Sequence, residues 1–144
     1  MGKLKTDLLP RIYIPATDEL LSLDDLISLA GEIDAILCYA YLGDVTVSVT
    51  GDKAAATYED GFLEELLVFL KGKGVQGITF MPSRNSMTQL NRLMGLCENY
   101  GFVQISGEDI NSPRQSFICE QLAKPEFRHL ADAAWMLVNR EKEG

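Results

Sequence analysis

The sequence predicts a single α/β domain built from parallel βα units. Three continuous apolar segments, at residues 35–41, 75–81 and 102–106, have the length of strands and lack strict alternation. Such segments are typical of strands that are buried on both faces of a parallel sheet. Segments with helical spacing of their apolar residues separate them, and this alternation indicates parallel units with right-handed crossovers.

The chain length sets the size of this domain. With 144 residues, of which 47% are hydrophobic, residues 1–144 are expected to form one compact unit. Three clear strands and a fourth candidate at residues 45–49 are too few to close an eight-stranded barrel. The sheet is therefore either open or part of a barrel.

The first elements are a short strand and a helix. Residues 11–15 (RIYIP) are β-branched and aromatic, which favours a strand at a sheet edge. A helix is predicted from Ser22, with Asp25 as its capping partner, and Gly31 and Asp34 are expected to end it. Its apolar face comprises Leu23, Leu26, Ile27, Ala30 and Ile33.

Residues 42–61 form the least patterned stretch and are predicted to be a long loop, which in compact domains often carries function. A second helix follows from Phe62, and Gly72 and Gly74 provide its stop.

A third helix is predicted to begin at Ser86 with Gln89 as its capping-box partner and to end at Gly101. The last helix begins near Pro125, a residue favoured in a first helical turn. The side chains that it is expected to bury are Phe127, Leu130, Ala131, Ala134, Trp135 and Val138.

Charge excludes some classes of partner. Thirteen basic and 21 acidic residues give a net charge of −8, so no broad cationic field attracts nucleic acid or an anionic membrane. No apolar run approaches the roughly 20 residues of a membrane-spanning helix. Residues 1–10 lack the apolar centre of a secretory signal, and we expect a cytoplasmic protein.

The metal-binding residue types are sparse. Cys38, Cys97 and Cys119 are widely spaced and form no CxxC pair, so they are interpreted as small buried hydrophobes. The single histidine, His129, has no second ligand at the spacing that zinc-binding helices use.

Polar side chains gather in the loops that follow the three strands, at residues 42–44, 82–86 and 107–114, which we call the rim. Parallel α/β folds bind ligands at this edge of the sheet. Asp44, Glu108 and Asp109 could hold a divalent cation through oxygen. Arg84 and Arg114 carry the planar fork that suits phosphate or carboxylate. The alternative is that these residues only build turns and ordinary ion pairs.

Two segments resemble the polymerase-and-histidinol-phosphatase (PHP) family of metal-dependent phosphoesterases. Residues 74–112 (GVQGITFMPSRNSMTQLNRLMGLCENYGFVQISGEDINS) resemble its closing part, with a Gly-x-x-Gly-Ile strand, a Tyr-Gly turn and a strand that ends near Gly-Ser-Asp-x-His. Residues 22–44 (SLDDLISLAGEIDAILCYAYLGD) resemble its Ser-Leu-Glu-Glu helix and the strand that ends in Ala-His-Pro-Gly. The resemblance covers residues 22–111 in order and implies part of a distorted, TIM-like (βα) barrel.

The chain departs from the family pattern at the metal-binding positions. Asp109 matches the Asp of the last motif, but Asn111 stands at its His. Tyr41 stands at the His of Ala-His-Pro-Gly, and Thr79 stands where the family places an acid. The His-x-His of the first strand has no counterpart. Asn is a weak substitute for the neutral imidazole ligand.

The resemblance implies phosphate ester hydrolysis by water bound to a divalent metal (Zn, Mn or Mg). Either the chain is the C-terminal part of a longer protein, or it belongs to a divergent branch without the full metal set. We expect the C-terminal part of a PHP-like phosphoesterase, which is inactive as an isolated chain. The alternative is a non-catalytic module that binds a protein or an anionic small molecule, such as a phosphorylated one. The candidate residues are Asp109, Glu108 and Asn111 for metal, Arg84, Asn85 and Arg114 for substrate, and Tyr41 and Asp44 elsewhere on the rim.

The strand count also predicts assembly. Part of a barrel exposes the apolar inner face that its missing half would cover, so we expect a homodimer or a missing N-terminal half. The inner-face candidates are Ile36, Cys38, Ala40, Ile78, Phe80, Phe102 and Ile105.

Overall fold

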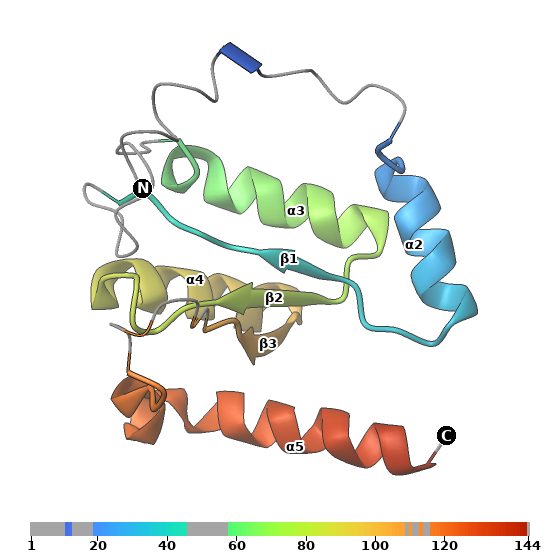
Figure 1. The fold of residues 1–144 in the computed structure, drawn as a ribbon. Helices are drawn as coiled ribbons and strands as arrows, with labels where there is room; N and C mark the ends of the chain where they lie inside the picture. Colours follow the sequence, from blue (N-terminus) through green and yellow to red (C-terminus); the bar gives the residue numbers. More distant parts are fainter. Residues whose placement is uncertain are drawn as a thin grey trace.

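The computed structural model of the chain describes residues 11–12, 19–45, 58–108, 110, 113 and 116–143. The protein is an α/β structure with a parallel sheet of three strands in the order β1-β2-β3 (Figure 1). The elements are α2 (Leu23–Glu32), β1 (Cys38–Ala40), η1 (Asp60–Phe62), α3 (Leu63–Lys73), β2 (Gly77–Phe80), α4 (Met87–Tyr100), β3 (Val103–Ser106), η2 (Glu120–Ala123), η3 (Pro125–Phe127) and α5 (Arg128–Glu143). The three predicted strand regions are thus confirmed.

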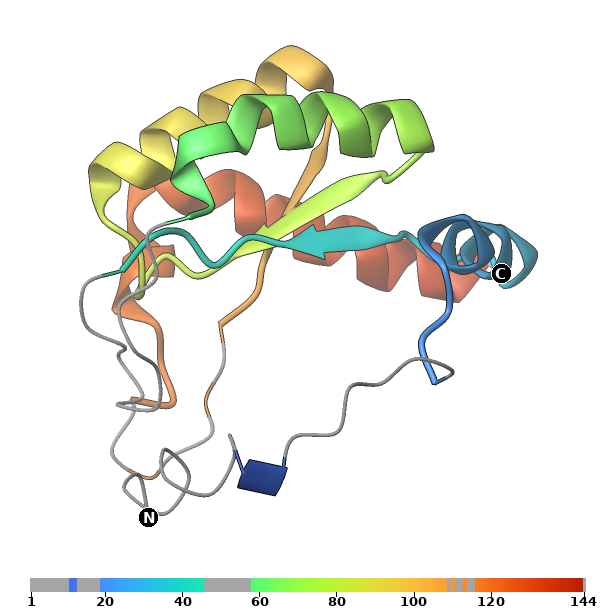
Figure 2. The ribbon, with the colours of Figure 1, turned by 90° about the horizontal axis from the view of Figure 1, so that it is seen from above.

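One face of the sheet carries the core. Ile78 and Phe80 on the central strand are almost fully buried, and they belong to one cluster with leucines of α3 and α4. The two helices lie side by side along the sheet in both views (Figures 1 and 2). The apolar faces of α3 and α4 therefore cover Ile78 and Phe80, which are alternate residues of β2.

The opposite face is less completely covered. The register pairs Ala40 with Thr79 and Thr79 with Ile105, which places these three side chains on the same face. Ala40 is exposed, whereas Thr79 and Ile105 are half-buried.

The seven expected inner-face residues therefore divide between the two faces of the sheet. Ile78, Phe80 and Phe102 are buried, whereas Ile36, Cys38 and Ile105 are half-buried and Ala40 is exposed. Periodicity could not separate them, because both faces of the predicted strands are apolar.

Several predicted helix ends are confirmed. Ser86 and Gln89 form a complete capping box at the start of α4. Gly74 and Gly101 adopt left-handed φ angles of 97° and 67° and end α3 and α4. At α2, Ser22 Oγ accepts the backbone N–H of Asp25, as expected of an N-cap.

Other expectations need correction. Arg11 and Ile12 are helical rather than extended, and the rest of the expected strand at 11–15 lies outside the described residues. α2 has no buried residue, although its sequence is amphipathic. Of the candidate strand at 45–49 only Val45 is described, in an isolated bridge.

α5 packs beside β3, at the far end of the molecule from α3 (Figure 1). Leu130 is buried there, and Ala133 and Leu137 are half-buried along the same helical stripe. The prediction for this helix was partly wrong: Phe127 and Leu130 are buried, but Ala131, Ala134, Trp135 and Val138 are exposed. Among the described residues, no helix is long and apolar enough to cross a membrane.

Candidate functional site

Hydrogen bonds join the loops that follow the three strands. The carbonyl of Leu42, after β1, accepts from Arg84 Nε at 3.1 Å and from Asn85 Nδ2 at 2.8 Å, both after β2. The carboxylate of Glu108, after β3, accepts from the backbone N–H of Ser83 at 2.9 Å and from its hydroxyl at 2.5 Å. The strand ends therefore meet in one continuous rim.

Asp44 holds the far end of the long loop against β1. Its Oδ1 accepts the backbone N–H groups of Tyr58 at 2.8 Å, Glu59 at 2.8 Å and Asp60 at 3.4 Å. The N–H of Tyr58, followed by those of Glu59 and Asp60, lowers the pKa of Asp44, because these donors favour the charged carboxylate. Residues 44 and 58–60 are thus fixed side by side.

Glu59 binds back onto the turn after β1. Its Oε2 accepts the backbone N–H of Leu42 at 3.1 Å and that of Gly43 at 2.7 Å. Its Oε1 accepts the hydroxyl of Tyr39 at 2.7 Å. Burial, followed by this hydrogen bond, raises the pKa of Tyr39, which therefore remains a protonated donor.

Asp60 is the centre of a partly buried polar contact. Tyr41, which is 1% exposed, donates its hydroxyl to Asp60 Oδ1. Asp60 Oδ2 accepts from Gln89 Nε2 at 2.7 Å, and the Asp60 carbonyl accepts from Arg92 at 2.6 Å. Burial, followed by the bond to Asp60, raises the pKa of Tyr41 and keeps its hydroxyl protonated. We call Tyr39, Tyr41, Asp44, Glu59, Asp60 and Gln89 the rim network.

The turn at Gly43 leaves no room for a side chain. Its φ is +68°, and a Cβ built there would lie 2.4 Å from Asn85 Nδ2 and 2.8 Å from Tyr41 Oη. Asn85 is only 8% exposed, and its Oδ1 has no hydrogen-bond partner within the part of the chain that the structure describes. The amide of Asn85 and the hydroxyl of Tyr41 thus pack directly against the glycine backbone.

The described rim residues do not fit a divalent metal ion. Both carboxylate oxygens of Glu59 and of Asp60, and Oδ1 of Asp44, accept hydrogen bonds from separate donors. Within the described ranges, no group of three His, Cys, Asp or Glu side chains could hold a metal. Glu108 is bound by Ser83. Asp109, Asn111 and Arg114, which complete the predicted site, lie outside the described residues.

Five predicted rim residues come together in the structure: Tyr41, Asp44, Arg84, Asn85 and Glu108. Sequence reasoning missed Tyr39, Glu59, Asp60 and Arg92. The sequence assigned Gln89 only to the helix cap. In the structure its Oε1 accepts the backbone N–H of Ser86 in the cap, while its Nε2 donates to the carbonyl of Asp44 and to the carboxylate of Asp60. The local sequence gives no signal for this second role, because the two partners are 45 and 29 positions away from Gln89.

Within the described residues, no cysteine and no histidine hydrogen-bonds to a side chain of the rim network. Cys97 is buried in the core, and burial raises its pKa to about 12, so the prediction of a small buried hydrophobe is confirmed for it. Cys38 and Cys119 are half-buried. His129 lies 3.2 Å from the side-chain oxygen of Gln104 on β3.

Comparisons of the chain with models of protein families, with curated proteins and with solved structures find no match.

Proposed function

We propose that this chain is the C-terminal part of a PHP-like phosphoesterase fold that acts as a non-catalytic module. The observation that carries the proposal is the contact between Tyr41 and Asp60. Tyr41 stands where the resemblance expects a metal-binding histidine, and it is buried with its hydroxyl on a carboxylate. A protonated phenol that already donates to an acid is a poor metal ligand.

The rest of the rim network supports this proposal. Glu59 and Asp44 accept backbone N–H groups on both sides of the long loop, so their charge stabilises the loop ends. A metal ion would have to compete with these donors, which are already in place. Any hydrolysis in a longer form of the protein would need ligands from other strands, such as the His-x-His that the family carries.

The experiment is a turnover assay on a generic phosphate ester with Mn²⁺, Zn²⁺ or Mg²⁺, with and without a chelator. We expect no chelator-sensitive turnover above the metal-only background. Asp60→Asn is the matched variant, because it would abolish a rim-based activity but not the activity of a contaminating phosphatase. Chelator-sensitive turnover that disappears in Asp60→Asn would refute the proposal.

A second candidate function is the binding of an anionic small molecule, such as a phosphorylated metabolite, at Arg84. The bond from Arg84 Nε to the carbonyl of Leu42 fixes the guanidinium, and Nη1 and Nη2 have no hydrogen-bond partner among the described residues. Arg84 also lies just before the N-terminus of α4, where the helix dipole favours anions.

Titration with inorganic phosphate, followed by amide chemical shifts, tests this second function. Arg84→Gln is expected to abolish shifts near residues 82–86, whereas Arg128→Gln, an exposed arginine on α5, is expected to leave them unchanged. Equal shifts in the two variants would show a general salt effect rather than a site.

A further inference from the structure

The side of α5 that is turned away from β3 exposes large apolar side chains. Trp135 is 65% exposed, and Met136 and Val138 are each 39% exposed. Only one stripe of this helix, around Leu130 and Leu137, is turned towards β3. α5 therefore has an apolar surface that the described part of the chain leaves bare.

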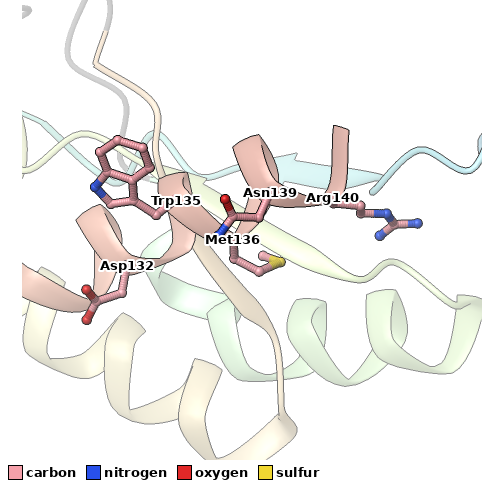
Figure 3. A pocket seen from close by; sticks show the side chains of 5 residues that line it. All are labelled: Asp132, Trp135, Met136, Asn139 and Arg140. Atoms are coloured by element: carbon pink, nitrogen blue, oxygen red, sulfur yellow. The ribbon is translucent and has the colours of Figure 1, made fainter. Parts of the chain in front are cut away.

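Part of this surface forms a shallow hollow of about 480 Å³. Its lining comes from five residues of α5 alone, which we call the outer face: Asp132, Trp135, Met136, Asn139 and Arg140 (Figure 3). Figure 3 shows Asp132 and Arg140 towards opposite ends of the outer face, with Met136 between them.

The charges on the outer face have a specific arrangement. Asp132 and Arg140 lie four residues before and four residues after Met136, at about 6 Å on either side of it along the helix axis. A two-fold axis that passes near Met136 would bring the Asp132 of each copy opposite the partner's Arg140. The outer face is therefore complementary in charge to a second copy of itself in antiparallel orientation, which is what a two-fold interface requires.

The apolar residues agree with this geometry. In the same antiparallel arrangement Trp135 lies between the heights of the partner's Met136 and Asn139, where sulfur and amide groups can contact the indole. Arg140 is positioned in advance, because its Nη2 donates to the carbonyl and carboxylate of Asp34. Its remaining N–H groups can still reach a second carboxylate.

We propose that the chain self-associates through the outer face of α5, as an antiparallel two-fold dimer centred on Met136. Asp132 and Arg140 set the direction of pairing, and Trp135 supplies the main buried area. This inference rests on α5 alone and is independent of the function proposed for the rim.

The single tryptophan of the chain provides a direct readout. Its emission is expected to shift to shorter wavelength as the concentration rises from about 1 µM to about 300 µM, the range suited to a small interface. Sedimentation measurements on the same samples should show the monomer converting to a dimer. A chain that stays monomeric throughout this range would overturn the proposal and leave the outer face to another partner. A dimer that forms without any emission shift would also overturn it, because the interface would then lie elsewhere.

Charge exchange tests the pairing itself. Asp132→Arg leaves two positive charges on the outer face and Arg140→Asp leaves two negative ones, so each variant alone is expected to dimerise at least about tenfold more weakly. An equimolar mixture of the two should form a heterodimer with affinity closer to that of the unmodified chain. Glu141→Arg, an exposed change on α5 outside the hollow, is the control and should dimerise normally. A mixture that fails to recover, while both variants keep the helical circular dichroism of the parent, would rule out the antiparallel arrangement.

Discussion

Tyr41 and Asp60, which are 19 positions apart in the sequence, share a hydrogen bond at the carboxyl end of β1. The phenol is 1% exposed and the carboxylate also accepts from Gln89, so the contact lies between the sheet, the long loop and α4. The structure thus joins three segments through a position where the family resemblance expects a metal ligand.

Removal of the Tyr41 hydroxyl measures this contact. Tyr41→Phe keeps the ring in the core and leaves one Asp60 oxygen without its donor, so the free energy of unfolding should fall by about 1–3 kcal/mol. Urea denaturation gives the value. The control is Tyr58→Phe. Tyr58 is 74% exposed and its ring packs against Phe62, so the loss of its hydroxyl should change the free energy of unfolding by less than about 0.5 kcal/mol. Equal effects of the two changes would contradict the assignment.

Acid should weaken the contacts of Asp44. Its pKa is lowered in the folded state by the N–H groups of Tyr58, Glu59 and Asp60. Its contribution is therefore complete above the unfolded pKa of about 4 and is lost as the pH falls through the lower folded value. The stability difference between the parent and Asp44→Asn should be largest near neutral pH and shrink in acid, whereas Glu141→Gln, an exposed change on α5, should have little effect at neutral pH. A difference between the parent and Asp44→Asn that does not change with pH would show that the charge of Asp44 has no structural role.

A pair of glycine substitutions tests the turn after β1. Gly43→Ala would place a methyl group within 2.4 Å of Asn85 Nδ2 at a φ of +68°, and it should cost about 1–3 kcal/mol. Gly95→Ala lies inside α4, where no described side chain or other segment comes within 4 Å of the new methyl group, and it should instead stabilise the protein by about 0.5–1 kcal/mol. Thermal unfolding of both variants gives the comparison, and a neutral Gly43→Ala would mean that the turn is not closely packed.

Two substitutions separate the two roles of Gln89. Ser86→Ala removes only the N-cap and should cost about 1 kcal/mol. Gln89→Glu keeps an oxygen for the cap but replaces the donor to the Asp44 carbonyl and to Asp60 with a second carboxylate, so it should cost at least about 2 kcal/mol. If Gln89→Glu were the milder change in denaturant titrations, the inward contacts of Gln89 would not matter for stability.

Local signals in the sequence predicted the elements well. A capping box at Ser86 and left-handed glycines at positions 74 and 101 are determined by the chemistry of neighbouring residues, so one segment is enough to recognise them. The positions of Asp44 and Arg84 on one rim followed from the rule that parallel strands end at the same edge.

Long-range contacts could not be predicted in this way. Glu59 and Asp60 lie in a stretch without periodicity, and their partners Tyr39 and Tyr41 are in a strand that reads only as apolar. Trp135 and Val138 follow an apolar helical pattern but are exposed. Such a pattern does not say whether the surface that covers these side chains belongs to the same chain or to another one. α2 shows the same difficulty, since its amphipathic sequence buries no residue completely.

The most direct test of the central claim compares the free energy of unfolding in a chelator with that in Mn²⁺ or Zn²⁺. At a metal concentration of about 100 times the dissociation constant of a site, a bound metal would raise the free energy of unfolding by about 2.7 kcal/mol. If the rim network consists of hydrogen bonds between its own residues, the parent and Asp60→Asn should each show the same unfolding free energy with metal and with chelator. A gain in stability with metal that is present in the parent and absent in Asp60→Asn would contradict this account, because Asp60 would then be a metal ligand.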